Sequence, residues 1–292
     1  MYFNNGIYPI PSDNIPLIPI SNKCVVLDLD QTLIATQDEM ISLKTLGILT
    51  NPKLISLRNR IYHIIIYNSN SSNSNSSNSN NSNSNNSNSN SSNSNSSNSN
   101  SSNSNSSNSN SSNSDKVYEY WGIVRPHINE FLLFCFSYFK VVAIWSAGER
   151  KYVEEIVAHI FKDLPKPHII YARENTQISK NSVLKSLDKL FNHNSIFKKY
   201  MNTKNTLAID DNLTTFANNK GNGVGIPAFE PDLTIASMSK EDNTLLKLMY
   251  WLLQPQVISC DDVTKLDKSK IFTTSIDLYK KKYIPNPNFK FS

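Results

Sequence analysis

The sequence predicts an α/β fold in which a parallel sheet carries helices on both faces, and three observations support this class. The run Cys24–Leu27 is short, apolar and β-branched, as in a buried central strand. From Pro126 onward, strand-like runs alternate with helical runs, which is the order of elements in a parallel sheet with crossover helices. Several strand-like runs end in polar residues, as strands do at the ligand-binding edge of such a sheet.

The individual elements are predicted from their patterns. Short runs rich in Val, Ile and aromatic residues predict strands at residues 24–27, 61–67, 117–124, 141–145, 168–171, 206–209 and 224–226. Longer runs predict helices at residues 129–138, 149–162, 182–191 and 242–253. Residues 1–22 carry prolines between apolar residues, which argues against a helix and predicts an extended arm.

Residues 68–114 are almost entirely Asn and Ser and contain no apolar or charged side chain. Such a tract cannot bury enough surface to offset the entropy of ordering, so we expect it to be disordered. It lies between two predicted strands, 61–67 and 117–124, and is therefore expected to be an overgrown hairpin loop. An inert loop is the first interpretation, and an interaction arm is the alternative.

Composition limits the classes of partner. The net charge of +5 suits an anionic substrate, but no dense basic stripe predicts direct nucleic-acid binding. The cysteines are Cys24, Cys135 and Cys260, which are far apart and odd in number, so we expect a reducing compartment, nucleus or cytoplasm. No signal peptide is recognised, and the longest apolar run, 131–139, is too short to span a membrane.

Two acidic side chains, Asp28 and Asp30, follow the first strand two residues apart. Burying neighbouring carboxylates costs several kcal/mol unless a cation pairs with them, and magnesium is the usual partner where a phosphate completes the shell. Another acidic pair, Asp210 and Asp211, follows a later strand. All four carboxylates should meet at one edge of the sheet. A single acidic pair after a strand, taken alone, is more often part of a solvated turn.

Groups that hold phosphate are also predicted at this edge. A hydroxyl and backbone N–H groups at Ser146, Ala147 and Gly148 precede a helix and can form a phosphate cradle. A lysine is needed to neutralise the transferring phosphate. We expect Lys185, on the helix 182–191, to supply it, with Lys180 and Lys189 as alternatives. Alone, each element also fits a cap, a turn or a solvated face.

Together these residues carry a specific resemblance. Asp28-x-Asp30-x-Thr32, Ser146, Lys185 and Asp210-Asp211 resemble the four motifs of the haloacid dehalogenase superfamily of phosphotransferases. Finer features are similar to the RNA polymerase II C-terminal-domain (CTD) phosphatase branch, which includes the small CTD phosphatases. These features are 26–33, Arg125-Pro126, 130–132, 146–148 with Lys151-Tyr152, Arg173-Glu174, and 209–212. Ser146 stands where the branch usually has Thr.

The resemblance implies a fold and a division of the chain. The fold would be a Rossmann-like parallel sheet of the haloacid dehalogenase type with a small antiparallel β insertion after the first strand. Residues 1–22 would be an arm, 23–253 the catalytic domain interrupted by 68–114, and 254–292 a C-terminal extension.

The resemblance also implies an activity and residue roles. Asp28 would attack phosphorus to form an aspartyl-phosphate, and Asp30 would act as general acid and then general base. Magnesium would be held by Asp28, Asp210 and the backbone carbonyl of Asp30, with Asp211 acting through water. The phosphate-binding residues would be Thr32, Ser146, Ala147, Gly148 and Lys185.

The implied substrate is phosphoserine beside proline in a disordered polypeptide, such as the RNA polymerase II C-terminal domain. In the resembled family, the small antiparallel insertion forms a proline-accepting pocket beside the active site. Candidate pocket residues are Ile61, Ile64, Tyr118, Tyr120 and Arg173.

Two other functions stay open. A catalytically weak or dead relative could be a phosphopeptide-binding scaffold, although the retained acids argue against it. A phosphatase for small molecules or nucleic-acid ends would need a different cap, and no helical cap of suitable size is predicted between Leu33 and Arg125.

Replacing residues 68–114 with a short Asn-Gly turn should preserve phosphatase activity. It should also raise the free energy of unfolding by about 2 kcal/mol, because closing a long loop costs entropy. Denaturant unfolding and a phosphopeptide assay check both expectations. Lost activity in a shortened variant that keeps its fold would show that the tract contacts the substrate.

Overall fold

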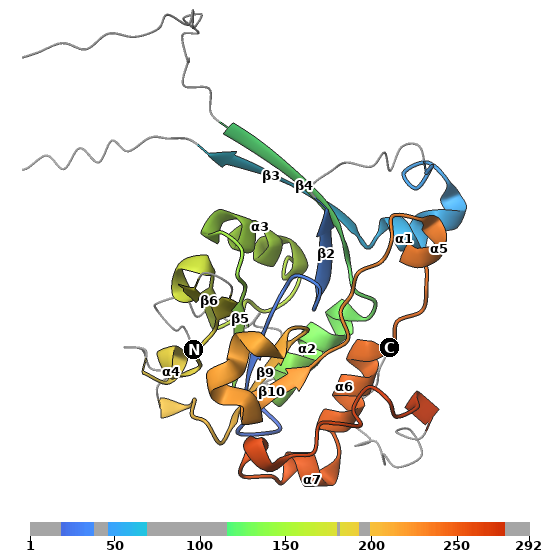
Figure 1. The fold of residues 1–292 in the computed structure, drawn as a ribbon. Helices are drawn as coiled ribbons and strands as arrows, with labels where there is room; N and C mark the ends of the chain where they lie inside the picture. The colour runs from blue at the N-terminus through green and yellow to red at the C-terminus, as the bar shows by residue number, and fades with distance from the viewer. Residues whose placement is uncertain (1–18, 38–45, 69–115, 180–181, 193–198, 278–292) are drawn as a thin grey trace, which may run out of the picture. The chain divides into compact units, whose positions relative to one another are not determined.

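The computed structural model describes residues 19–37, 46–68, 116–179, 182–192 and 199–277 (Figure 1). Residues 67–118 form a unit of their own, in which only 67–68 and 116–118 are described. The other unit, residues 1–66 and 119–292, contains the central sheet and its helices. In the described part of the chain, no helix is long and apolar enough to cross a membrane.

A five-stranded parallel sheet forms the centre of the larger unit. Its order is β10-β9-β1-β5-β6, and every neighbouring pair is parallel. The strands are β1 (Cys24–Leu27), β5 (Val141–Trp145), β6 (Ile169–Tyr171), β9 (Thr206–Asp210) and β10 (Gly223–Gly225). This arrangement confirms the predicted α/β class. The first strand lies in the middle, as its fully buried apolar sequence requires.

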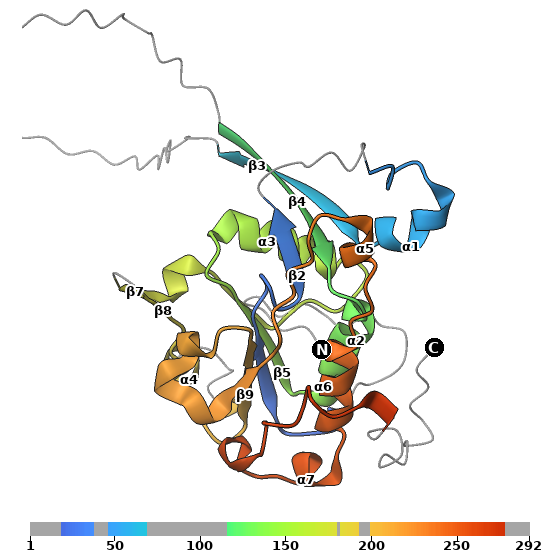
Figure 2. The same cartoon turned by 45° about the vertical axis from the view of Figure 1, so that its right-hand side comes forward.

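The two faces of β1 pack into different clusters. Val25 and Leu27 belong to a core with α2 (Ile128–Tyr138), α3 (Arg150–Ile160) and α6 (Thr244–Leu252). Cys24 and Val26 point to the opposite core, which includes residues of α4 (Asp188–Phe191) and of the 3₁₀ segment η4 (Leu213–Asn222). Figure 2 shows the sheet between α4 on one side and α2 with α6 on the other. Successive strand residues alternate in direction, so helices cover both faces.

A small antiparallel sheet is inserted after β1, as the sequence predicts. It consists of β2 (Ile34–Gln37), β3 (Ile61–Asn68) and β4 (Lys116–Val124), in the order β2-β4-β3. Residues Ile34 to Gln37 pair antiparallel with Val124 to Trp121. Sequence analysis missed β2, because four residues directly after a polar turn give too short a pattern. Asn68 ends β3, and the rest of the Asn/Ser tract lies outside the described residues.

The predicted helix 182–191 is wrong in its first half. Residues Gln177–Ser179 and Ser182–Leu184 form a hairpin, β7 and β8, and only Asp188–Phe191 is helical. The backbone N–H of Lys185 donates to the carbonyl of Thr215 at 2.7 Å, and the Lys185 side chain is buried. Tertiary contacts of one lysine therefore override a local sequence that favours a helix.

The remaining short elements connect these layers. They are η1 (Pro52–Leu54), α1 (Ile55–Arg58), η2 (Arg173–Asn175), α5 (Ile235–Met238), α7 (Pro255–Ile258) and η5 (Val263–Lys265). The expected N-terminal arm lies outside the described residues up to residue 18. Next to it, the backbone N–H groups of Ile20 and Ser21 donate to carbonyls at the end of α2. Packed residues continue past 253, since Val257, Val263 and Ile271 are buried in the larger core.

Ile271→Ala should lower the free energy of unfolding by about 2–4 kcal/mol, because it removes a buried side chain from the core. The matched control is Ile178→Ala, whose side chain is exposed and whose loss should change stability by less than about 0.5 kcal/mol. Urea unfolding of both variants measures the difference. Equal effects would mean that the segment after 253 does not stabilise the domain.

Candidate active site

Strand register brings two acidic side chains together at the carboxyl edge of the central sheet. Leu27 lies opposite Ile209, so the next residues, Asp28 and Asp210, stand side by side. The backbone N–H of Asp28 donates to the carbonyl of Ile209 at 3.0 Å, which fixes this alignment. From β1 the chain continues to β5 and β6 on one side of it and then to β9 and β10 on the other, so the carboxyl ends of β1 and β9 lie where ligands bind in open α/β sheets.

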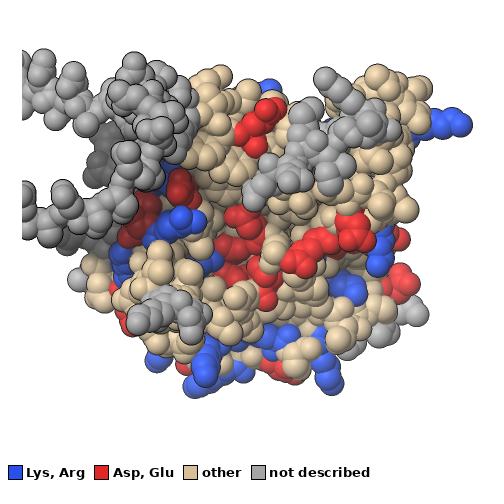
Figure 3. Space-filling view, turned by 45° about the horizontal axis from the view of Figure 1, so that its top comes forward, with Lys and Arg blue, Asp and Glu red and all other residues tan. Residues whose placement is uncertain are grey.

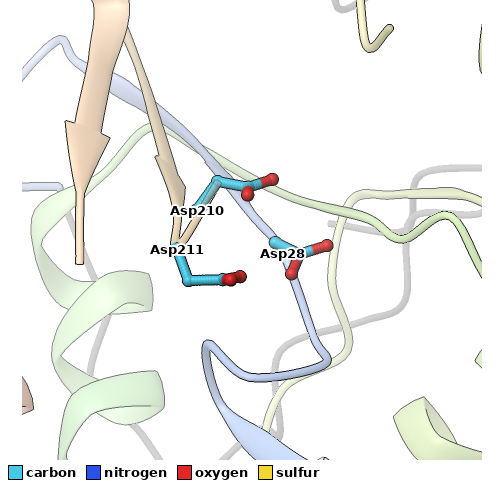
Figure 4. A group of neighbouring side chains, drawn as sticks. All are labelled: Asp28, Asp210 and Asp211. Carbon is cyan, nitrogen blue, oxygen red and sulfur yellow. The ribbon is translucent and has the colours of Figure 1, made fainter. Parts of the chain in front are cut away.

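Three carboxylates form a cluster at this edge. Oxygens of Asp28, Asp210 and Asp211 lie within 4.8 Å of one another, and Figure 4 shows the three side chains close together. Burial raises the pKa of Asp28, which the neighbouring Asp210 raises further. Burial and Asp210 likewise raise the pKa of Asp211. Each shift reflects the cost of keeping buried, neighbouring carboxylates ionised, which Lys185 offsets in part.

Lys185 lies between two of these acids. Its Nζ is 2.5 Å from Asp28 Oδ1 and 2.7 Å from Asp210 Oδ2, and its side chain is 2% exposed. Burial alone would lower the pKa of Lys185, but the two carboxylates raise it above its usual value. The ammonium is therefore charged, and it compensates for only part of the negative charge.

The structure thus brings Lys185 to the acids, although from a loop after β8 and not from a helix. The alternative Lys189 is exposed, and its Nζ donates to the carbonyl of Asn175 at 3.0 Å. Lys180 lies outside the described residues.

Thr32, an expected phosphate-binding residue, contacts Asp211 at the same sheet edge. Its buried hydroxyl donates to Asp211 Oδ1 at 3.2 Å and accepts from the backbone N–H of Asp211 at 3.1 Å. Its own N–H donates to the carbonyl of Leu29 at 3.2 Å. These contacts connect the turn after β1 to Asp211, so Thr32 positions that carboxylate; its phosphate-binding role stays a prediction.

The expected cradle follows β5 directly. The Ser146 hydroxyl, which is buried, accepts from the backbone N–H of Gly148 at 3.0 Å. Arg173 holds the same loop, since its Nε donates to the carbonyl of Ala147 at 2.9 Å and its N–H to that of Gly148 at 2.8 Å. A Cβ on Gly148 would lie 2.7 Å from the ring of Tyr152, so glycine is required there.

Asp30 has surroundings quite unlike those of Asp28. Its Oδ1 accepts from the hydroxyls of Thr36, at 3.1 Å, and Tyr152, while its Oδ2 lies 3.4 Å from the Ser146 hydroxyl. Burial raises the pKa of Asp30, and the hydrogen bonds from Tyr152 and Thr36 oppose that rise. The carboxyl of Asp30 does not join the group of three that can hold a metal.

Arg125 supports the turn that carries these acids, a role that sequence analysis did not assign. Its buried guanidinium donates to the carbonyls of Thr32 at 2.9 Å and Pro227 at 2.8 Å, and its Nε to Asp242 at 2.9 Å. In the same turn, Gln31 has a positive φ of 61°, a conformation that is uncommon outside glycine. The motif Arg125-Pro126 was the available signal.

Arg125 and Asp242 also line a cavity of about 490 Å³. The acidic cluster does not line it, so the candidate active site is the open sheet edge and not this cavity. On one face of the molecule, Figure 3 shows acidic side chains gathered in the middle with basic ones beside them.

The expected pocket residues do not form one wall. Ile61 packs with the cluster around Ile123, whereas Ile64 is buried in the larger core, so the two lie on opposite faces of β3. Tyr120 makes an edge-on contact with Tyr152, at 5.4 Å between ring centroids. Tyr152 in turn donates a hydrogen bond to Asp30. Tyr118 and Arg173 are exposed.

Lys185→Met should abolish activity and lower the free energy of unfolding by about 3–5 kcal/mol, because it leaves two buried carboxylates without their cation. The stability deficit should shrink as the pH falls below the raised pKa of Asp28, since a protonated carboxyl needs no cation. Lys189→Met, at an exposed position, is the matched control. Thermal unfolding of both variants across pH measures the stability deficit and its dependence on pH. A mutant as stable as the control would contradict the pairing.

The geometry can be compared with known proteins. The family model of NLI interacting factor-like phosphatases matches residues 88–264, which is more than half of the chain.

Two solved structures also match, one of Fcp1, an essential RNA polymerase II CTD phosphatase, and one of a fission yeast Fcp1 variant bound to beryllium fluoride. Each is 16% identical, with a TM-score of 0.44 over 80% of this chain. The alignments cover 49% and 51% of those chains, so this chain spans about half of their length. No curated protein matches. The chain belongs to the family of NLI interacting factor-like phosphatases.

Proposed function

We propose that the protein is a magnesium-dependent protein serine phosphatase that works through an aspartyl-phosphate on Asp28. The observation that carries the proposal is the placement of Lys185 between Asp28 and Asp210, at the sheet edge that also carries the Ser146 cradle. A nucleophile, a cation and phosphate-binding donors are thereby collected within one small volume. Phosphoryl transfer needs these parts, because its catalysis is mainly positioning and charge stabilisation.

The family match begins at residue 88 and therefore includes Ser146, Lys185 and Asp210 but not Asp28 or Asp30. The fold connects the two parts. Strand β1 lies between β5 and β9, which puts its C-terminal acids beside the matched residues. This placement supports assigning Asp28 and Asp30 to the same site as the family segment.

The donor set fits a magnesium ion. Carboxylate oxygens are the ligands that this ion prefers, and three of them gather at the edge while Lys185 neutralises only one charge. We assign Asp28 and Asp210 as side-chain ligands, Asp30 as a ligand through its backbone carbonyl, and Asp211 as a partner through water. When bound, the ion supplies positive charge that stabilises the phosphoryl oxygens.

In the first step, a carboxylate oxygen of Asp28 attacks phosphorus, and the bond from phosphorus to the seryl oxygen breaks. Asp30 gives its proton to the departing seryl oxygen. The pKa of Asp30, which burial raises, suits a group that must hold a proton before it donates one. Lys185 and the donors of residues 146–148 stabilise the negative charge on the phosphoryl oxygens.

In the second step, water attacks the phosphorus of the aspartyl-phosphate and loses a proton to Asp30. The bond between phosphorus and Asp28 breaks, which releases phosphate and restores both carboxyl groups. Asp30 therefore exchanges one proton per cycle, while the ammonium of Lys185 contacts Asp28 and Asp210.

For the substrate we propose phosphoserine beside proline in a disordered polypeptide, with the RNA polymerase II C-terminal domain as a candidate and the nucleus or cytoplasm as the compartment. The family match supports a phosphorylated polypeptide. The small antiparallel sheet supports a binding surface beside the site, since Tyr120 of β4 contacts Tyr152 next to Asp30.

Asp28→Asn should lower kcat by at least about a thousandfold without unfolding the protein, because it removes the nucleophile at nearly constant volume. The matched control is Asp188→Asn, at an exposed position on α4, which should retain activity. Phosphate release from phosphoserine-proline peptides, nucleotides and sugar phosphates is measured with and without magnesium. Activity of Asp28→Asn within tenfold of the unsubstituted protein would contradict the mechanism. A preference for nucleotides or sugar phosphates would contradict the proposal of a phosphoserine-proline substrate.

A further inference from the structure

We propose that Tyr62, Thr36 and Tyr152 form a chain of hydroxyls that positions Asp30 and decides which of its oxygens gives the proton to the leaving group. The inference rests on the proposed function and adds residues that touch neither phosphate nor metal. These are positioning residues, and they come from β3, β2 and α3.

The contacts are short and mutual. The Thr36 hydroxyl lies 2.6 Å from the Tyr62 hydroxyl, 2.6 Å from the Tyr152 hydroxyl and 3.1 Å from Asp30 Oδ1. Tyr152 also donates directly to Asp30 Oδ1. Thr36 and Tyr152 therefore contact Asp30 directly, whereas Tyr62 is connected to it through their hydroxyls.

The directions of the hydrogen bonds follow from counting protons. Each hydroxyl has one proton to donate, and an ionised carboxylate only accepts. Tyr152 and Thr36 both donate to Asp30 Oδ1, so neither has a proton left for Tyr62. Tyr62 must then be the donor in its contact with Thr36. Two hydroxyl protons thus point at one oxygen of Asp30, and Tyr62 supports the hydroxyl of Thr36.

This arrangement assigns the acid proton to the other oxygen. Oδ1 already accepts two hydrogen bonds, so a proton carried by Asp30 is placed on Oδ2. Oδ2 is the oxygen on the side of Ser146, at 3.4 Å from its hydroxyl, where the cradle holds phosphate in the proposed mechanism. The chain of hydroxyls therefore turns the acidic proton towards the bond that must break.

Tyr62 can take part because the sheet leaves room for it. Its ring is buried and crosses β4 at Gly122, where an added Cβ would lie 2.3 Å from the Tyr62 hydroxyl and 2.6 Å from the carbonyl of Ala35. Any larger residue at 122 would displace the phenol from Thr36. The ring also contacts His159 of α3, at 5.4 Å between centroids, which fixes its other side.

The test exploits the leaving group, because a poor leaving group needs a proton and a good one does not. Tyr62→Phe should lower kcat by about tenfold on a phosphoserine peptide, whose alkoxide leaves poorly, and by less than about twofold on p-nitrophenyl phosphate. Thr36→Val should act in the same direction, and Thr36→Ser, which keeps the hydroxyl, should restore the peptide rate.

Two controls separate the possible causes. Tyr138→Phe removes another buried tyrosine hydroxyl, which donates to the carbonyl of Leu252 at 2.7 Å, and should change both rates equally or not at all. Asp30→Asn should show a larger peptide-selective loss than Tyr62→Phe. If Asp30→Asn shows no selectivity, the proposed mechanism fails. If it does and Tyr62→Phe reduces both substrates alike, or neither, the hydroxyl chain fails while the mechanism stands.

Discussion

The contact of one buried ammonium with two buried carboxylates is the constraint on which the site depends. Asp28 and Asp210 are forced together by the parallel register of β1 and β9, and two adjacent carboxylates inside a protein repel each other strongly. Lys185 reaches both because the chain before it forms a hairpin and its N–H is held by Thr215. The sheet, the hairpin and η4 are therefore all needed for one ion-pair geometry.

The two acids of the first motif have different surroundings. Asp28 contacts a cation, whereas Asp30, two residues on, contacts hydroxyls. In the proposed mechanism, Lys185 opposes the rise that burial causes in the pKa of the nucleophile Asp28, and the neutral donors around Asp30 allow the protonated form that an acid needs. Arg125 holds the turn that follows them through the carbonyl of Thr32.

Several parts of this arrangement could be predicted from the sequence, and others could not. The run before Asp28 and the pair Asp210-Asp211 gave strong local signals, because a buried strand ending in acids is unusual. Lys185 was expected on a helix, whereas it follows the strand β8, whose three residues have no periodicity to recognise. Tyr62 and Thr36 looked like ordinary strand residues. Only the pairing of β2 with β4, and the glycine at 122, brings their hydroxyls to Asp30.

The length of β3 has a mechanical consequence. Tyr62 lies near the first residue of this strand and Asn68 is its last, so roughly 20 Å of extended backbone separates the phenol from the start of the Asn/Ser tract. Strand β4 lies beside β3 in the sheet, so a displacement at one end of β3 is resisted along its length. Strand β3 acts as a stiff spacer. Changes in the number of Asn and Ser residues after it are thereby insulated from the ångström-scale geometry around Tyr62.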